Sequence, residues 1–199
     1  MQHQRQPNGS EVYCQLLNTA SLHLLPGSSY AESLAHETKK ETYISGEASL
    51  HFLDLGHYLV YADEVQIELN QGAFHVMAYP ECRHLVVESV SAKLKVHYQG
   101  NLIYLKAGQQ LIIDRTLRIP MVRKQGDNCP SLNCLPLDIC IAILSRKFDS
   151  KIELVPGIDH ALMVIFNRGA LKLKQALEPV CEQLNLKMSM HEASVRLSP

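Results

Sequence analysis

Apolar and polar residues alternate along most of residues 11–114, which is the pattern of β-strands that bury one face. In one such run Val65, Ile67 and Leu69 fall on one side of an extended chain, and the residues between them fall on the other. The alternation predicts a strand-rich region. Its strands are predicted at residues 11–17, 21–26, 41–53, 57–62, 64–69, 73–79, 84–98, 101–107 and 109–114.

Turn-forming residues separate these runs, at 70–72 and at Pro80 for example. Gly100 and Asn101 are predicted to form a two-residue hairpin turn, because glycine at the first central position accepts a positive φ. Many short strands at this spacing indicate a mainly β protein. We therefore predict an antiparallel β-rich domain at residues 11–119, built as a sandwich, a barrel or a β-solenoid.

The pattern changes in the last third of the chain. Residues 120–131 are polar and contain glycine and proline, which predicts a linker. Residues 132–198 are predicted to form a small α+β domain in the order helix-strand-strand-helix-strand-strand, with two similar halves on one sheet. Pro179 lies inside the second helix and is expected to kink or delay it. Two apolar stripes at four-three-four spacing define the helices: Leu137, Ile141, Leu144 and Phe148, then Leu173, Leu177, Val180 and Leu184.

Length and charge limit the classes of partner. A chain of 199 residues can bury a core in one large domain or in two small ones. It carries 19 basic and 20 acidic residues with no basic run, so neither nucleic acid nor an anionic membrane surface is expected as a partner. No apolar run approaches the roughly 20 residues that span a bilayer. We expect either a cytosolic protein or an excised part of a longer chain.

Catalytic motifs are missing from the sequence: there is no nucleophile elbow, no phosphate-binding glycine loop and no His-Glu-x-x-His. The ten histidines occur singly. Glu47 with His51 and His57 is compatible with a metal site or an acid–base pair, and equally with surface residues on a β scaffold. His75 is expected to be half-buried or solvent-facing with a hydrogen-bond partner, and His97 to lie on a wet face. The sequence predicts a protein that is not an enzyme and holds no cofactor.

The six cysteines do not predict a metal site either. Cys129 and Cys134 have four residues between them. This spacing gives at most half of a zinc site, and no second half follows. A disulfide between these two residues is compatible with an oxidising compartment, and the sequence leaves this open. Cys140 and Cys181 fall on the apolar faces of the predicted helices and are expected in the core.

Residues 39–52 resemble the signature of FecR-family transmembrane regulators, through Lys40, Gly46-Glu47-Ala48 and the aromatic Phe52. Residues 132–198 resemble the small domain that follows in many such proteins, which is related to the signalling domain of secretins and TonB-dependent transporters. The chain departs from the family pattern at Asn18-Thr19-Ala20 and at Ala73. Three further FecR-like segments follow in the family order, at residues 16–30, 71–80 and 105–114.

The resemblance implies the periplasmic sensor and interaction region of an anti-sigma factor. Such a region relays a signal from a TonB-dependent outer-membrane transporter to an extracytoplasmic-function sigma factor. The implied partner is the N-terminal signalling domain of the transporter. The sigma factor would be reached only through a cytoplasmic segment, and the inner membrane only through a helix, both outside this sequence.

An exposed sheet edge can accept a strand from a partner, so the interaction is expected in the small C-terminal domain. The alternative is a β-sandwich module for a small ligand or a glycan, which needs aromatic and polar side chains that converge on a pocket. A sandwich enzyme would instead need several histidines and a glutamate at one point. The predicted partner-binding residues are Leu162, Met163, Val164, Ile165, Phe166 and Asn167, together with the final hairpin.

Overall fold

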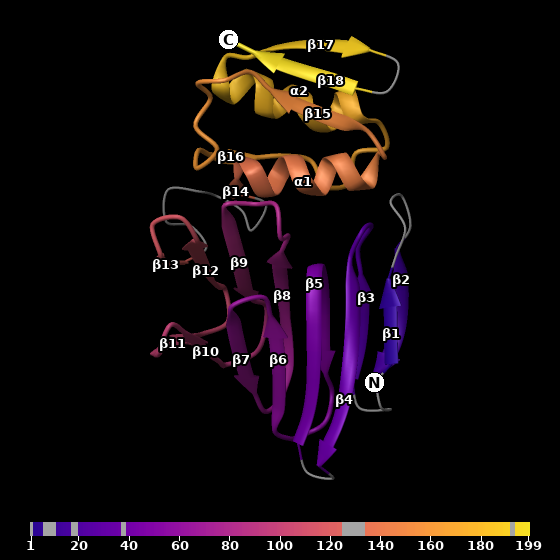
Figure 1. Ribbon diagram of the computed structural model, residues 1–199, viewed down its shortest axis with the longest axis vertical. Coiled ribbons are helices and arrows are strands. Elements are labelled where there is room, and N and C mark those ends of the chain that lie inside the picture. Colours follow the sequence, from indigo (N-terminus) through magenta and orange to yellow (C-terminus); the bar gives the residue numbers. More distant parts are fainter. Residues whose placement is uncertain (1, 6–10, 17–19, 37–38, 125–133, 192–193) are drawn as a thin grey trace. The chain divides into compact units, whose positions relative to one another are not determined.

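The computed structural model describes residues 2–5, 11–16, 20–36, 39–124, 134–191 and 194–199 (Figure 1). The chain divides into two compact units, Met1–Lys124 and Gln125–Pro199, and each is described by itself. Strands dominate the first unit, and both helices of the described chain lie in the second. The predicted fold class, mainly β with a small α+β part at the C-terminal end, is therefore confirmed.

The longest strand, β5 (Lys39–Phe52), joins the two halves of a large sandwich-like sheet in the first unit. Its first half pairs antiparallel with β4 (Ser29–His36) and parallel with β6 (Tyr58–Ala62). Its second half pairs antiparallel with β3 (Ala20–Leu24) and β8 (Gly72–Ala78). A strand has only two hydrogen-bonding edges, so β5 can serve four neighbours only by changing partners along its length.

The remaining strands extend the sheet on both sides of β5. On one side β6 is followed by β7, β10 and β11, and β1 lies beyond β4. On the other side β8 is followed by β9, β12 and β13, and β2 lies beyond β3. Their bounds are β1 Gln2–Arg5, β2 Val12–Leu16, β7 Val65–Leu69, β9 His84–Ser89, β10 Leu94–Tyr98, β11 Asn101–Leu105, β12 Gln109–Asp114 and β13 Ile119–Lys124.

The core of the first unit is formed by the apolar side of each alternating run. Val65, Ile67 and Leu69 are all buried, as their spacing predicts. Phe52 packs against Phe74, with ring centroids 6.3 Å apart, and both rings are buried. Strands from both halves of the sheet contribute to this one cluster, so the two halves enclose a common core.

Four local predictions are wrong. The predicted strand at 84–98 is two strands, β9 and β10, with a break between Ser89 and Leu94. The turn before β11 is Gln99-Gly100, and both residues have positive φ, as a type I′ turn requires. Strand β4 occupies residues 29–36, where no strand was predicted. Residues 120–124 of the predicted linker belong to β13, and residues 125–131 lie outside the described chain.

The second unit has the predicted order of helices and strands, preceded by a short strand that was not predicted. It contains β14 (Cys134–Pro136), α1 (Leu137–Lys147), β15 (Lys151–Leu154), β16 (Met163–Ile165), α2 (Leu173–Leu184), β17 (Lys187–His191) and β18 (Ser194–Ser198). The prediction of one sheet is wrong, because β14 pairs with β16 while β15, β18 and β17 form a separate sheet.

Each helix of the second unit buries part of its predicted apolar stripe. The buried members are Leu137, Leu144, Leu173, Leu177 and Val180. Ile141, Phe148 and Leu184 are only partly buried, so the predicted stripes are confirmed in part. Helix α2 runs through Pro179, so the expected delay in its start is wrong. Proline lacks the N–H that would bond the preceding turn, so α2 lacks one internal hydrogen bond there. No helix in the described residues is long and apolar enough to cross a membrane.

Candidate functional site

The structure separates the residues that suggested a metal or acid–base site. Glu47 is completely buried, whereas His51 and His57 are exposed. In the part of the chain that the structure describes, no group of three or more His, Cys, Asp or Glu residues could hold a metal ion. Glu47, His51 and His57 therefore do not form one site.

Glu47 instead lies at the point where β5 changes partners. The hydroxyl of Tyr79 donates a 2.9 Å hydrogen bond to Oε2 of Glu47, and the Glu47 N–H donates a 2.7 Å bond to Oγ of Ser28. The backbone N–H of Leu25 donates to the Glu47 carbonyl at 3.1 Å. Gly46 has a φ of +94°, a conformation that glycine adopts more readily than other residues. These contacts position β5 against β3 and β8.

His75 and His97 lie on strands β8 and β10, as expected. His75 is half-buried and hydrogen-bonded to the hydroxyl of Ser49. His97 is 41 % exposed in its side chain, and its Nε2 lies 3.0 Å from Oε1 of Glu68.

The predicted partner-binding segment consists of β16 and its flanks. Leu162 and Asn167 are exposed, while Val164 and Phe166 are buried. One edge of β16 pairs with β14. On the other edge, Oε1 of Gln183 accepts a 2.9 Å bond from the Ile165 N–H, and Nε2 of Gln183 donates a 2.6 Å bond to the Ile165 carbonyl. The Gln183 amide therefore occupies part of the edge that a partner strand would use, and the role of this segment in binding stays a prediction.

Replacing Gln183 by alanine is expected to lower the free energy of unfolding of the second unit by about 1 kcal/mol, because two backbone hydrogen bonds of Ile165 are lost at a solvent-accessible edge. Urea unfolding followed by circular dichroism at 222 nm measures this, since both helices of the described chain lie in this unit. Gln175→Ala on the exposed side of the same helix is the matched control. Equal losses for the two variants would contradict the role of Gln183.

Strand β13 is an exposed apolar edge that sequence reasoning assigned to the linker. It pairs with β12, and among the described strands it has no second neighbour. Ile119, Met121 and Val122 are between 43 % and 55 % exposed, and Leu117 before the strand is also exposed. The apolar residues at 119–122 were the signal in the sequence that could have predicted this strand. An exposed apolar strand at a sheet edge is a candidate surface for a partner.

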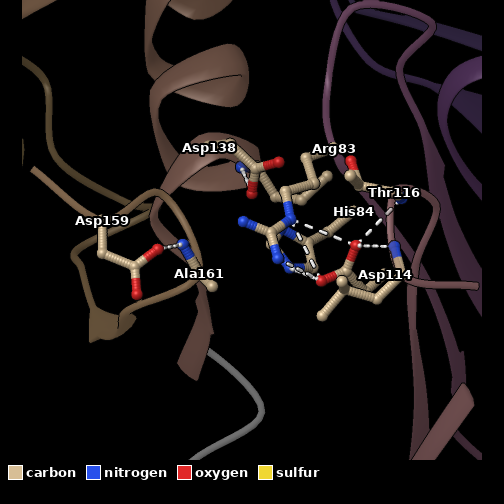
Figure 2. Close-up of polar contacts among 9 residues, drawn as sticks. Arg83, His84, Asp114, Thr116, Asp138, Asp159 and Ala161 are labelled. Atoms are coloured by element: carbon tan, nitrogen blue, oxygen red, sulfur yellow. Dashed lines mark hydrogen bonds and ion pairs between the residues drawn. The ribbon is translucent and has the colours of Figure 1, made fainter. Parts of the chain in front are cut away.

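An ion pair between Arg83 and Asp114 lies at the turn between β12 and β13 (Figure 2). Nε of Arg83 donates to Oδ1 and Oδ2 of Asp114 at 3.1 and 3.0 Å. The backbone N–H groups of Thr116 and Leu117 donate to Oδ1 of Asp114 at 2.9 and 3.0 Å. These donors favour the carboxylate, with the Arg83 bonds first among them, and they lower the pKa of Asp114 to about 2. The pair therefore fixes the turn between β12 and β13.

The low pKa of Asp114 predicts a loss of stability in acid. The carboxylate stabilises the fold fully above the ordinary aspartate pKa near 3.8, and this contribution disappears as the pH falls towards about 2. Asp114→Asn should cost about 1–2 kcal/mol at pH 6 and progressively less below pH 4. Urea midpoints at several pH values, read from tyrosine fluorescence, test this because all eight tyrosines lie in the first unit. Asp54→Asn, at an exposed position, is the control; a pH-independent loss would contradict the prediction.

The described cysteines include three buried thiols, Cys82, Cys140 and Cys181. Cys140 and Cys181 are buried free thiols, as expected, and burial raises the pKa of both, that of Cys140 far above its usual range. Cys134 is disulfide-bonded. The residue considered as its partner, Cys129, lies outside the described residues, so the pairing of these two cysteines stays open.

Solved structures share this fold over nearly the whole chain. One crystal structure from Parabacteroides distasonis, at 2.50 Å resolution, matches with a TM-score of 0.85 and 17 % identity, covering 98 % of this chain and 97 % of that one. A second, at 1.65 Å resolution, matches with a TM-score of 0.85 and 16 % identity, covering 100 % and 99 %. Both are described as a "putative anti-sigma factor". No family model and no curated protein matches the chain.

Proposed function

We propose that this chain is the sensor and interaction region of an anti-sigma factor. The observation that carries the proposal is the likeness in fold to the two Parabacteroides distasonis structures, which extends over both units. The FecR-like segments, in the family order along the sequence, support the same class. Where β5 changes partners, the buried polar groups of Glu47, Ser28 and Tyr79 hydrogen-bond one another. This fits a protein that acts through its surfaces.

In the finer form of the proposal, the chain lies in the periplasm as part of an inner-membrane protein. It receives a signal from the N-terminal signalling domain of a TonB-dependent outer-membrane transporter. It passes the signal to an extracytoplasmic-function sigma factor through a membrane helix and a cytoplasmic segment outside this sequence. The chain acts by binding and not by catalysis.

The contact surface in this proposal is the segment at 162–167 with the hairpin of β17 and β18. Strand β17 is the outer strand of its sheet, and Met190 on it is 52 % exposed. Outer strands with exposed apolar side chains supply both backbone bonds and apolar contact to a partner strand. The proposal thus involves edges of two separate sheets in the second unit.

Titration calorimetry of the full chain with the separately expressed signalling domain of a transporter encoded beside it tests the proposal. Leu162→Arg and Met190→Arg should each weaken binding by about tenfold or more, because each places a charge in an apolar contact. Leu55→Arg, at an exposed position of the first unit, should leave binding unchanged. Absence of binding by the folded chain would overturn the function, and a loss confined to Val122→Arg would move the contact to β13.

A further inference from the structure

The first unit contains a pocket of about 700 Å³. It lies against β10 and β11 and is also lined by residues that precede β6 and follow β7. Lys93 and Lys95 come from one wall, Tyr104 and Lys106 from the next, and His57 from the loop before β6. The pocket belongs to one compact unit, so its shape is set by the sheet itself.

The pocket carries an excess of positive charge, although Glu68 lies directly opposite Lys95 in the register of β7 and β10. Three lysines line it, all exposed, and Glu68 is the one acidic side chain in the lining. Glu68 already accepts a 3.2 Å bond from Nε2 of Gln66 and lies 3.0 Å from Nε2 of His97. Among the described residues, no ion pair engages the ammonium groups of the three lysines. A concave surface with charge of one sign concentrates ions of the opposite sign.

An aromatic ring stands beside this charge. Tyr104 is 63 % exposed and lies opposite Lys95 in the antiparallel register of β10 and β11. Directly opposed residues of an antiparallel pair project on the same face, so the ring and the ammonium group border the same space. An exposed phenol ring offers a flat apolar surface, and His57, Asn70 and Gln71 add hydrogen-bonding groups to the lining.

We propose that this pocket binds a small anionic sugar, meaning a pyranose ring that carries a carboxylate, a sulfate or a phosphate. The acid group meets the ammonium groups of Lys93, Lys95 and Lys106, and the apolar face of the ring packs on Tyr104. The amide and imidazole groups of the lining hydrogen-bond the ring hydroxyls. The inference goes beyond the proposed signalling function and does not depend on it.

Binding can be measured on the full chain by titration in heteronuclear NMR. The probes are glucuronate, glucose 6-sulfate and glucose 6-phosphate, with glucose as the uncharged match and inorganic sulfate as the match without a ring. We expect shifts in the amides of residues 91–95 and 104–106 with the anionic sugars, and at least tenfold weaker binding of glucose. The double variant Lys95→Gln and Lys106→Gln should bind the anionic sugars about tenfold more weakly. Lys187→Gln, an exposed lysine on β17, should have no effect.

Tyr104→Ala separates the two parts of the proposal. It should weaken the binding of glucose 6-sulfate by about fivefold and leave the binding of inorganic sulfate unchanged, because only the sugar packs on the Tyr104 ring. Equal binding of glucose and the anionic sugars, or unchanged binding after the double lysine substitution, would overturn the anion site. Equal binding of inorganic sulfate and glucose 6-sulfate would overturn the sugar assignment. A cooperative urea transition of the first unit in each variant, followed by the fluorescence of the tyrosines that remain, shows that this unit is folded.

Discussion

Replacing Gly46 by alanine is expected to destabilise the first unit by about 3 kcal/mol, from an unfavourable backbone conformation together with overpacking. The φ of +94° disfavours any side chain at this position. A Cβ atom would also lie 2.5 Å from Oγ of Ser28 and 2.9 Å from its Cα. Ser28 is buried and bonds the Glu47 N–H, so it cannot move away without breaking that bond.

Gly100→Ala separates the two causes. Gly100 also has a positive φ, of +78°, but an added Cβ atom would meet nothing within 4 Å. This variant should therefore lose only the conformational part, about 1 kcal/mol. Urea unfolding monitored by tyrosine fluorescence gives both values for the first unit. Similar losses for the two variants would show that the close approach of Ser28 to Gly46 does not matter for stability.

Tyr79→Phe should cost about 2 kcal/mol, because it removes a donor from a buried carboxyl group. Tyr79 and Glu47 are both almost completely buried, so water cannot easily replace the 2.9 Å bond. The ring volume is kept, so the loss reports the hydroxyl and not a cavity. The same urea experiment on the first unit measures this.

Tyr104→Phe is the control for that variant. It removes the same hydroxyl from a side chain that is 63 % exposed, and its effect on stability should stay within about 0.5 kcal/mol. If Tyr79→Phe were as mild as Tyr104→Phe, Glu47 would be satisfied without Tyr79. The buried carboxyl would then not be what links β5 to the segment after β8.

The alternation along the chain predicted most of the strands, because each strand buries one face in a single core. It could not predict that β5 serves both halves of the sheet, since pairing partners are set by contacts distant in sequence. The glycine at position 46 was visible in the sequence, but the burial of Glu47 beside it was not. A strand pattern does not show where a strand changes its neighbours. Pro120 and the charged end of β13 made that strand look like a linker.

The surfaces were less predictable than the core. The segment at 162–167 was recognisable as a strand, yet the Gln183 side chain that bonds its edge comes from a helix almost twenty residues later. Lys93 and Lys95 alternate with buried residues and so were expected on a wet face. Their meeting with Tyr104 and His57 in one pocket depends on how β10, β11 and the loop before β6 come together, and no local pattern encodes this.

The division of β5 between four neighbours has a consequence for how the first unit opens. Melting either half of the sheet leaves that half of β5 without partners and exposes the core that both halves share, so neither half is expected to persist as a separate intermediate. Amide protons of β3 and β6, which share no direct pairing, should therefore exchange with solvent at a common slowest rate.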